Sequence, residues 1–329
     1  MPTSPLTGHR ISVVVCSFSE QRWDELCAAI ASLQQQSLVP EDVVLVIDHN
    51  DKLFERAVGA FEQVTITRNT AEKGLSGARN TGTETARGNI ILFLDDDATA
   101  DHRWVEHMVA PLEDPDVVGV GGFAIPAWEG GAAPNWFPEE FYWVVGCSYR
   151  GLPAHREQIR NPIGATMAFR ASSLRECNGF ASSLGRVRDK PVGCEETDLS
   201  LRIAAEQPQS RVVLARDAVV YHRVPRQRQT TRYFLRRCYW EGVSKAVLAH
   251  RLGERAGLGL SEERKHALRT LPQGMLLAVA EAWKRRSPAL ALRAGSIPMG
   301  LAVTAAGYVA GNLKVASSGN DAVVEAARV

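Results

Sequence analysis

Apolar and polar positions follow two different periods along the N-terminal part of the chain. Short apolar runs rich in β-branched residues predict four strands, at 11–18, 42–49, 64–69 and 89–97. The segments between them carry apolar residues at helical spacing and predict three helices, at 21–36, 51–62 and 75–88. Because strands and helices alternate, the sequence predicts an α/β fold: a mainly parallel sheet with helices on both faces.

A different organisation begins after a further strand expected at 117–124. Residues 125–153 are rich in Trp, Pro and Gly, a composition suited to a long binding segment. A last strand is expected at 211–224, and the chain beyond it becomes helical and basic. We therefore expect two domains, a catalytic α/β domain at 1–225 and a helical C-terminal extension at 226–329.

Charge is distributed unevenly, although the 329-residue chain has a net charge of only +1. Residues 223–293 contain 16 Lys/Arg and 5 Asp/Glu. Basic helices with apolar faces are typical of proteins that bind anionic membrane surfaces. Nucleic acid is not an expected partner, because no nucleic-acid-binding motif accompanies the basic segment. We therefore expect the extension to associate with a membrane.

Residues 294–313 form an uncharged run that is long enough to cross a bilayer. The run is rich in Gly and Ala and contains Pro298, which makes its insertion into a membrane marginal. Gly307 and Gly311 have the G-x-x-x-G spacing of helices that pack closely. A single membrane span and an interfacial helix therefore both stay open.

The N-terminus and the cysteines predict the cellular compartment. Residues 1–10 are polar and lack the apolar core of a secretory signal. The six cysteines form neither a C-x-x-C pair nor a Cys/His cluster with zinc spacing, as expected of free thiols in a reducing compartment. The expected location is cytoplasmic, peripheral on the inner face of the cell membrane.

Three consecutive aspartates, Asp95, Asp96 and Asp97, end the fourth predicted strand, and Asp48 ends the second. Ligands of parallel sheets bind at the carboxyl ends of the strands, so these acids are expected to face one crevice. Mg²⁺ is usually held by one or two carboxylates plus substrate phosphates, and Mn²⁺ also prefers oxygen ligands. Asp95 and Asp97 therefore predict a metal site, with His222 at the end of the last strand as a third ligand or phosphate contact. Asp96 points away from that pair by strand alternation and is expected to serve the nucleotide or a cap.

Glu195, Glu196 and Asp198 begin an amphipathic helix predicted at 194–207. Acids in a first helical turn complement the helix dipole, which accounts for one or two of them. Three acids beside a glycine also favour a general base that takes a proton from an acceptor hydroxyl. Which of the three is the base stays open.

Five segments, in order, carry a resemblance to a known family: "VVVCSF", "VVLVIDHND", "GLSGARNTGTETARGNIILFLDDDA", "NPIGATMAFR" and "GCEETDLSLRI". Together they resemble family 2 inverting glycosyltransferases of the GT-A fold over residues 10–224. The resemblance implies a Rossmann-like domain whose D-x-D pair, Asp95 and Asp97, binds Mg²⁺ or Mn²⁺ with the diphosphate of a nucleotide sugar. It also implies that Glu196 takes the position usually held by the family's catalytic aspartate.

The same resemblance implies where the nucleotide sugar is bound. Asp48 corresponds to the aspartate that contacts the base or ribose, and the "ARN" helix places Arg79 and Asn80 near the donor. The first strand usually ends in Thr-Tyr-Asn in this family. Here it reads Ser17-Phe18-Ser19, so Ser17 is the donor contact assigned at that strand.

More narrowly, "FPEEFYWVVGCSYRGLP" and "RNPIGATMAFR" look like a subgroup described as glucosyl-dolichyl-phosphate glucuronosyltransferases. That resemblance implies UDP-glucuronate or another UDP-hexose as donor, and a saccharide on a polyprenyl or dolichyl phosphate as acceptor. Arginines that pair bidentately with a carboxylate or phosphate are then expected nearby; the candidates are Arg160, Arg170, Arg186 and Arg188.

Two alternatives are weighed against a glycosyltransferase. A sugar-phosphate nucleotidyltransferase carries a Gly-rich basic loop after its first strand, and "CSFSEQRWDE" is neither Gly-rich nor basic. A catalytically silent GT-A-fold binding protein would not need the metal and base candidates that the sequence retains. Both alternatives make distinct predictions for assays with nucleotide sugars.

Overall fold

The computed structural model describes residues 8–182, 193–252 and 261–328. The chain forms two compact units, which we call the sheet unit and the helical unit. The sheet unit comprises Met1–Ile125, Pro153–Gly185 and Glu195–His222. The helical unit comprises Pro126–Leu152, Arg186–Cys194 and Arg223–Val329.

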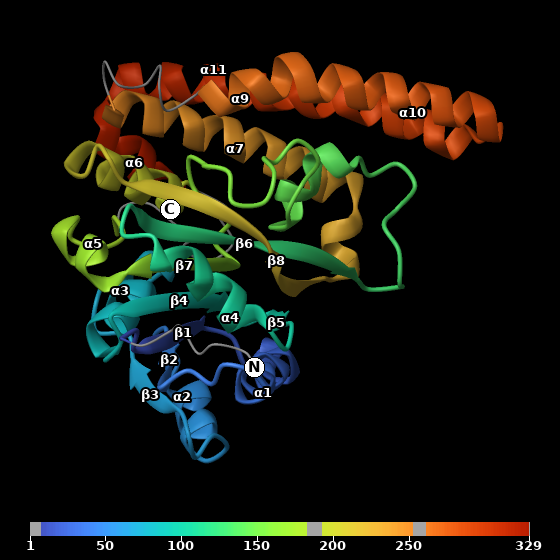
Figure 1. Cartoon of the computed structure of the whole chain (residues 1–329). Helices are drawn as coiled ribbons and strands as arrows, with labels where there is room; N and C mark the ends of the chain where they lie inside the picture. The colour runs from blue at the N-terminus through green and yellow to red at the C-terminus, as the bar shows by residue number, and fades with distance from the viewer. Residues whose placement is uncertain (1–7, 183–192, 253–260, 329) are drawn as a thin grey trace. The chain divides into compact units, whose positions relative to one another are not determined.

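The sheet unit is built on a sheet with the strand order β3-β2-β1-β4-β7-β6-β8-β5 (Figure 1). The strands are β1 (Ile11–Ser17), β2 (Asp42–Ile47), β3 (Thr65–Arg68), β4 (Ile90–Asp95), β5 (Ala98–Ala100), β6 (Val117–Trp128), β7 (Thr166–Arg170) and β8 (Arg211–Val224). The helical elements are η1 (Glu20–Arg22), α1 (Trp23–Gln34), α2 (Asp51–Val58), α3 (Leu75–Thr85), α4 (Trp104–Val109), η2 (Ala110–Glu113), α5 (Ala171–Glu176) and α6 (Glu195–Glu206).

The predicted parallel sheet is confirmed in β3, β2, β1 and β4, which pair in parallel. Both faces of β1, β2 and β4 are covered, which explains their continuous apolar runs. Val13 of β1 joins Leu26 and Ile30 of α1 in one hydrophobic cluster. On the other face, a methyl group placed on Gly82 of α3 would lie 2.3 Å from Val14, so the glycine lets α3 pack tightly on β1.

The remaining strands pair antiparallel, so the predicted mainly parallel sheet is a mixed one. β7 pairs antiparallel with both β4 and β6, and β5 pairs antiparallel with β8. β5 has only three residues, too few to show a period of two. Its pairing with β8 has a direct consequence, because it sets Ala98 opposite His222.

Among the described residues, the helical unit contains three longer helices, α7, α10 and α11, and several shorter helical segments. They are η3 (Glu139–Val145), η4 (Arg226–Gln229), α7 (Thr231–Leu252), α9 (Ser261–Lys265), η6 (His266–Thr270), α10 (Leu271–Arg285) and α11 (Pro288–Arg328), with α9, η6 and α10 following one another closely. Aromatic residues form its core: Phe137 and Phe141 lie within 5.4 and 5.3 Å of Phe234 of α7, measured between ring centroids. The Trp- and Pro-rich segment therefore contributes core packing to this unit.

All six cysteines of the chain are free thiols, as the sequence predicts.

Small residues form the contact between α7 and α11. A methyl group on Gly242 of α7 would lie 2.0 Å from the carbonyl oxygen of Thr304, and one on Gly307 would lie 2.0 Å from that of Tyr239. A methyl group on Gly311 would lie 2.7 Å from Ala246. The G-x-x-x-G spacing thus serves packing within the chain, where it lets the two helix backbones approach closely.

We expect Gly307→Ala to destabilise the chain by about 1–3 kcal/mol, because the added methyl group overpacks the contact with α7. Gly295→Ala on the same helix is the matched control, since a methyl group there would meet no described atom within 4 Å. That change should be neutral or stabilise the helix by about 0.5–1 kcal/mol. Chemical denaturation of both variants measures the difference, and equal stability of the two would contradict the packing described.

Candidate active site

The acidic turn after β4 lies beside the end of β8. Asp95 is the last residue of β4, and Asp97 directly precedes β5. Because β5 pairs with β8, His222 Nε2 lies 3.1 Å from Asp97 Oδ1. Asp95, Asp97 and His222 each offer one ligand atom, and these atoms lie within 4.8 Å of one another. The fold thus brings together three potential ligands from segments more than a hundred residues apart.

Asp96 lies outside this cluster and is held by a separate set of contacts. Ser17 Oγ donates a hydrogen bond to Asp96 Oδ2 at 2.6 Å, and Arg22 Nη1 lies 2.8 Å from Asp96 Oδ1. The same Arg22 nitrogen lies 3.3 Å from Asp97 Oδ2. Burial raises the pKa of Asp96 to about 6, against the lowering effect of Arg22. Part of the charge of the triple aspartate is therefore neutralised by a guanidinium from η1.

Arg79 is a buried arginine of α3 that joins the acidic turn to α6. Its side chain is 2% exposed and lies 3.5 Å from Asp95, 3.2 Å from Glu195 and 3.4 Å from Glu196. It also donates a hydrogen bond to the carbonyl oxygen of Gly164 at 3.1 Å. Burial disfavours the charged form, and the carboxylates of Glu196, Glu195 and Asp95 outweigh it, so the pKa of Arg79 lies above its ordinary value. Arg79 is thus a fixed positive charge among three carboxylates.

The three acids at the start of α6 have different surroundings. Glu195 is buried, with 4% of its side chain exposed, whereas Glu196 is 16% exposed. Asp198 pairs with Arg202 one turn later at 2.8 Å. Arg202 also donates a hydrogen bond to the carbonyl oxygen of Gly179 at 2.8 Å, which ties Asp198 to the chain after α5. Of the three carboxylates, Glu196 is the most exposed.

Gly164 makes room for the carboxylate of Glu196. A methyl group at this position would lie 2.0 Å from Glu196 Oε1 and 2.8 Å from an Arg79 guanidinium nitrogen. We expect Gly164→Ala to displace both side chains and to lower turnover at least tenfold, about 1.4 kcal/mol in the barrier. Gly193→Ala, just before α6, is the control, because a methyl group there would meet no described atom within 4 Å. Turnover of both variants tests this, and an active Gly164→Ala enzyme would contradict the proposed crowding.

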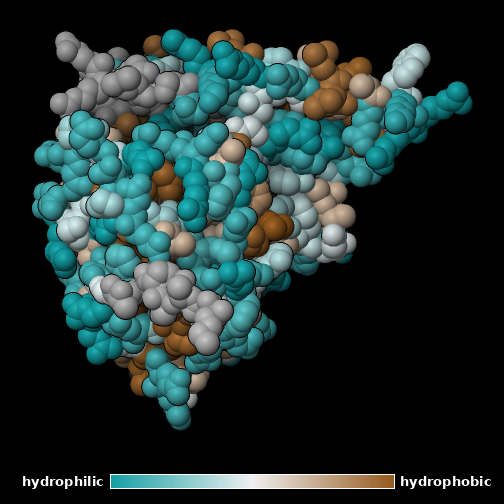
Figure 2. All heavy atoms as spheres, in the orientation of Figure 1, coloured by the Kyte–Doolittle hydropathy of each residue, from teal (hydrophilic) through white to brown (hydrophobic). Residues whose placement is uncertain are grey.

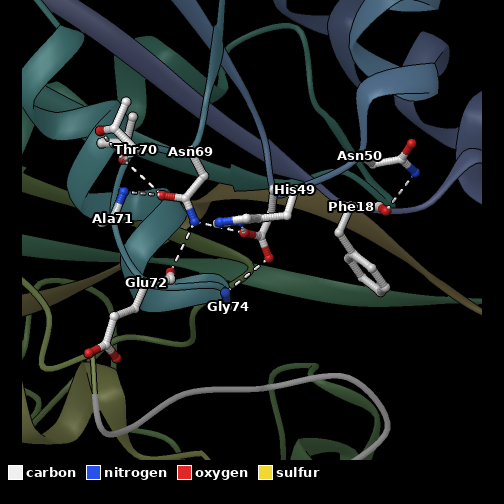
Figure 3. A network of polar contacts seen from close by, with 10 residues as sticks. Phe18, His49, Asn50, Asn69, Thr70, Ala71, Glu72 and Gly74 are labelled. Atoms are coloured by element: carbon white, nitrogen blue, oxygen red, sulfur yellow. Dashed lines mark hydrogen bonds and ion pairs between the residues drawn. The ribbon is translucent and has the colours of Figure 1, made fainter.

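Asp48, at the end of β2, anchors the loop that leads into α3. Its carboxylate accepts hydrogen bonds from Asn69 Nδ2 at 2.7 Å and from the backbone N–H of Gly74 at 3.0 Å. Figure 3 shows Asn69, His49 and Gly74 converging on this point, and His49 Nδ1 lies 2.8 Å from Asp48 Oδ1. Asn69 also accepts from the backbone N–H of Ala71 at 2.9 Å. This network fixes the start of α3 and thereby the helix that carries Arg79.

Other predicted contacts are engaged within the chain. Asn80 donates to the carbonyl oxygen of Phe180 and accepts from its N–H, both at 2.8 Å. Arg170 donates to backbone carbonyl oxygens of Val117 and Leu112. Arg160 donates to Asn161 Oδ1 at 2.8 Å. Arg186 and Arg188 lie outside the described residues.

Sequence reasoning missed Arg22 and Gly164. Arg22 lies in a three-residue 3-10 turn without periodicity, and nothing local relates it to an aspartate 74 positions away. Gly164 was noted only as part of a motif, although a glycine in "NPIGATMAFR" is a signal of close approach between backbone and side chain.

The fold places this site among known glycosyltransferase folds. A mannosyltransferase from Pyrobaculum calidifontis in complex with GDP-Man and Mn²⁺ superimposes with a TM-score of 0.57 at 19% identity, covering 97% of this chain and 87% of that one. GalNAc-T7 with UDP, GalNAc and Mn²⁺ superimposes with a TM-score of 0.52 at 16% identity, covering 78% of this chain and 54% of that one. These similarities show the GT-A fold.

The sequence defines the family. Residues 12–177 match the model of glycosyl transferase family 2. The glucosyl-dolichyl phosphate glucuronosyltransferase of Haloferax volcanii is 35% identical over 243 residues, which cover 73% of this chain and 77% of that protein. The chain therefore belongs to glycosyl transferase family 2 and is a glycosyltransferase.

Proposed function

We propose that this enzyme transfers a sugar, with inversion at the anomeric carbon, from a UDP-sugar to a hydroxyl of a saccharide on a polyprenyl or dolichyl phosphate. The observation that carries the proposal is the joint placement of Asp95, Asp97 and His222 with the Arg79-linked Glu196 in one unit. The similarity to the Haloferax enzyme, whose name includes a glucosyl-dolichyl phosphate, supports the lipid acceptor and makes UDP-glucuronate the preferred donor. The enzyme would work in the cytoplasm at the inner face of the cell membrane.

The cluster of Asp95, Asp97 and His222 fits a divalent cation. Two carboxylates and an imidazole within 4.8 Å of one another match the ligand types of first-row divalent ions and leave positions open for a diphosphate. The nitrogen ligand favours Mn²⁺ over Mg²⁺, which prefers oxygen ligands throughout. When bound, the ion would neutralise charge on the departing diphosphate. Asp96 stays outside this set and, with Ser17 and Asp48, lies on the nucleotide side in this proposal.

Glu196 is the preferred general base. Its carboxylate is partly exposed, and its contact with Arg79 holds it in place. Glu195 is more buried and Asp198 is engaged by Arg202. In the proposed step Glu196 takes the proton of an acceptor hydroxyl while the hydroxyl oxygen bonds to the anomeric carbon. The bond to the nucleoside diphosphate breaks as the new bond forms, and Arg79 keeps the remaining carboxylates paired.

A panel of labelled nucleotide sugars tests the proposal. The purified chain is incubated with each donor, a lipid extract and Mn²⁺, and label is followed into the organic phase. We expect one UDP-sugar to label the lipid, with loss of labelling in EDTA. Release of pyrophosphate from a nucleoside triphosphate and a sugar 1-phosphate would indicate the nucleotidyltransferase. Donor binding without transfer to any acceptor would indicate a silent binding protein.

A further inference from the structure

Apolar residues are exposed mainly on the last helices of the chain. Among the described residues, 15 large hydrophobic side chains are exposed, and 11 of them lie between positions 268 and 313. Hydrophobic residues, brown in Figure 2, appear over the region of α10 and α11 that Figure 1 labels. An exposed apolar surface of this extent marks an interaction site.

One stripe of this surface runs along α10. The buried residues of α10 are Leu271, Gly274 and Ala278. Leu276, Val279 and Trp283 lie on the opposite side of the helix, with 66%, 53% and 87% of their surfaces exposed. We call these three residues the α10 stripe.

Basic residues flank the α10 stripe at both ends. Exposed arginines and lysines precede it and follow it: Arg264, Lys265, Arg269, Lys284, Arg285 and Arg286. Residues 264–314 hold eight Lys/Arg and a single acid, Glu281. A tryptophan at the end of an apolar stripe, followed by cations, is typical of helices at the membrane–water interface. A second copy of the chain would bring a like-charged surface to this face, whereas an anionic lipid surface complements it.

α11 is long and apolar enough to cross a bilayer, over Pro288–Lys314, by length and composition. Its contacts with α7 argue against a span. Gly307 packs on Tyr239, and His250 Nε2 lies 3.0 Å from Asn312 Oδ1, so α7 accompanies α11 over several turns. α7 carries Arg237, which lies 3.8 Å from Glu241, together with further basic residues. A charged helix of this kind does not enter hydrocarbon without a large energetic penalty.

We propose that the helical unit docks in the plane of an anionic phospholipid surface through the α10 stripe and its flanking basic residues, with α11 remaining packed on α7 instead of crossing the bilayer. α11 also has exposed apolar residues, among them Leu292, Met299, Leu301, Val309 and Leu313. The proposal deepens the proposed function by naming the partner surface that would hold the enzyme near a lipid-linked acceptor. Its test uses vesicle binding alone and therefore does not depend on transfer activity.

The experiment is vesicle flotation of the full chain. Vesicles of phosphatidylcholine are compared with vesicles that also contain phosphatidylglycerol. We expect binding to the anionic vesicles to be at least about tenfold stronger and to fall with added salt. The triple variant L276E/V279E/W283E should lose at least about tenfold in binding, because it places acids on the apolar face.

The double variant V39E/V58E is the matched control, since both residues are exposed and belong to the sheet unit. It should bind as the wild type does, and thermal unfolding verifies that all variants fold. Undiminished binding of the triple variant overturns the α10 stripe as the docking surface. Wild-type protein that resists extraction by alkaline carbonate overturns the in-plane arrangement and indicates a span. A wild-type dimer that the triple variant converts to monomer, without vesicle binding by either, identifies a second copy as the partner.

Discussion

Asp97→Asn is expected to lower kcat/KM by about a thousandfold, which corresponds to about 4 kcal/mol of transition-state stabilisation. The amide keeps the size of the side chain but removes the negative charge that faces His222 at 3.1 Å and Arg22 at 3.3 Å. The metal ion would thereby be held more weakly, and charge neutralisation at the leaving diphosphate would be reduced. Initial rates over a range of Mn²⁺ concentrations measure the effect, and the variant should need more metal for its residual activity.

The control for this variant is Asp101→Asn, four residues further along the chain. Asp101 accepts a hydrogen bond from the backbone N–H of Arg103, and an amide oxygen can replace that acceptor. Its activity should stay within about twofold of wild type. Full activity of Asp97→Asn, or full activity of the wild type in EDTA, would contradict a catalytic role for the metal ion.

Glu196→Gln is expected to lower turnover by about 10²–10⁴-fold while donor binding is retained. The glutamine has the same shape but cannot accept the acceptor's proton at neutral pH. UDP binding measured by calorimetry should be close to wild type, and kcat should fall with little change in the donor KM. This split between binding and turnover separates a base from a residue that only positions the donor.

Three further substitutions resolve which acid is the base. Glu206→Gln, at the exposed end of the same helix, should leave turnover unchanged. Asp198→Asn is expected to weaken the pair with Arg202 and to act mainly on stability. Unchanged turnover in Glu196→Gln, combined with a large loss in Glu195→Gln, would move the base to the buried neighbour.

The regular part of the fold was predictable because its pattern is local. Apolar runs at 11–18 and 42–49 correspond to β1 and β2, and the predicted last strand has the same bounds as β8. Strands that are buried on both faces can be recognised in the sequence because they are nearly continuous runs of apolar residues. The family could likewise be recognised from the sequence, because its motifs lie in short continuous segments at strand and helix ends.

The site was predictable only in part, because its pairings depend on tertiary contacts. β5 is three residues long, yet its register brings His222 to Asp97. Arg22 pairs with Asp96 across the end of the sheet, and no sequence period links the two. The spacing of Gly307 and Gly311 predicts a close helix contact but not the partner helix. The structure shows that the partner is α7 of the same chain.

We propose that the acidic turn and the end of β8 hold a divalent cation on the donor diphosphate. A crystal grown with Mn²⁺ and UDP, measured near the manganese absorption edge, tests it directly. We expect one strong anomalous-difference peak in coordination contact with the Asp97 carboxylate and His222 Nε2, and with the UDP diphosphate. Bound UDP without a peak at these side chains, or a peak at other residues, would contradict it.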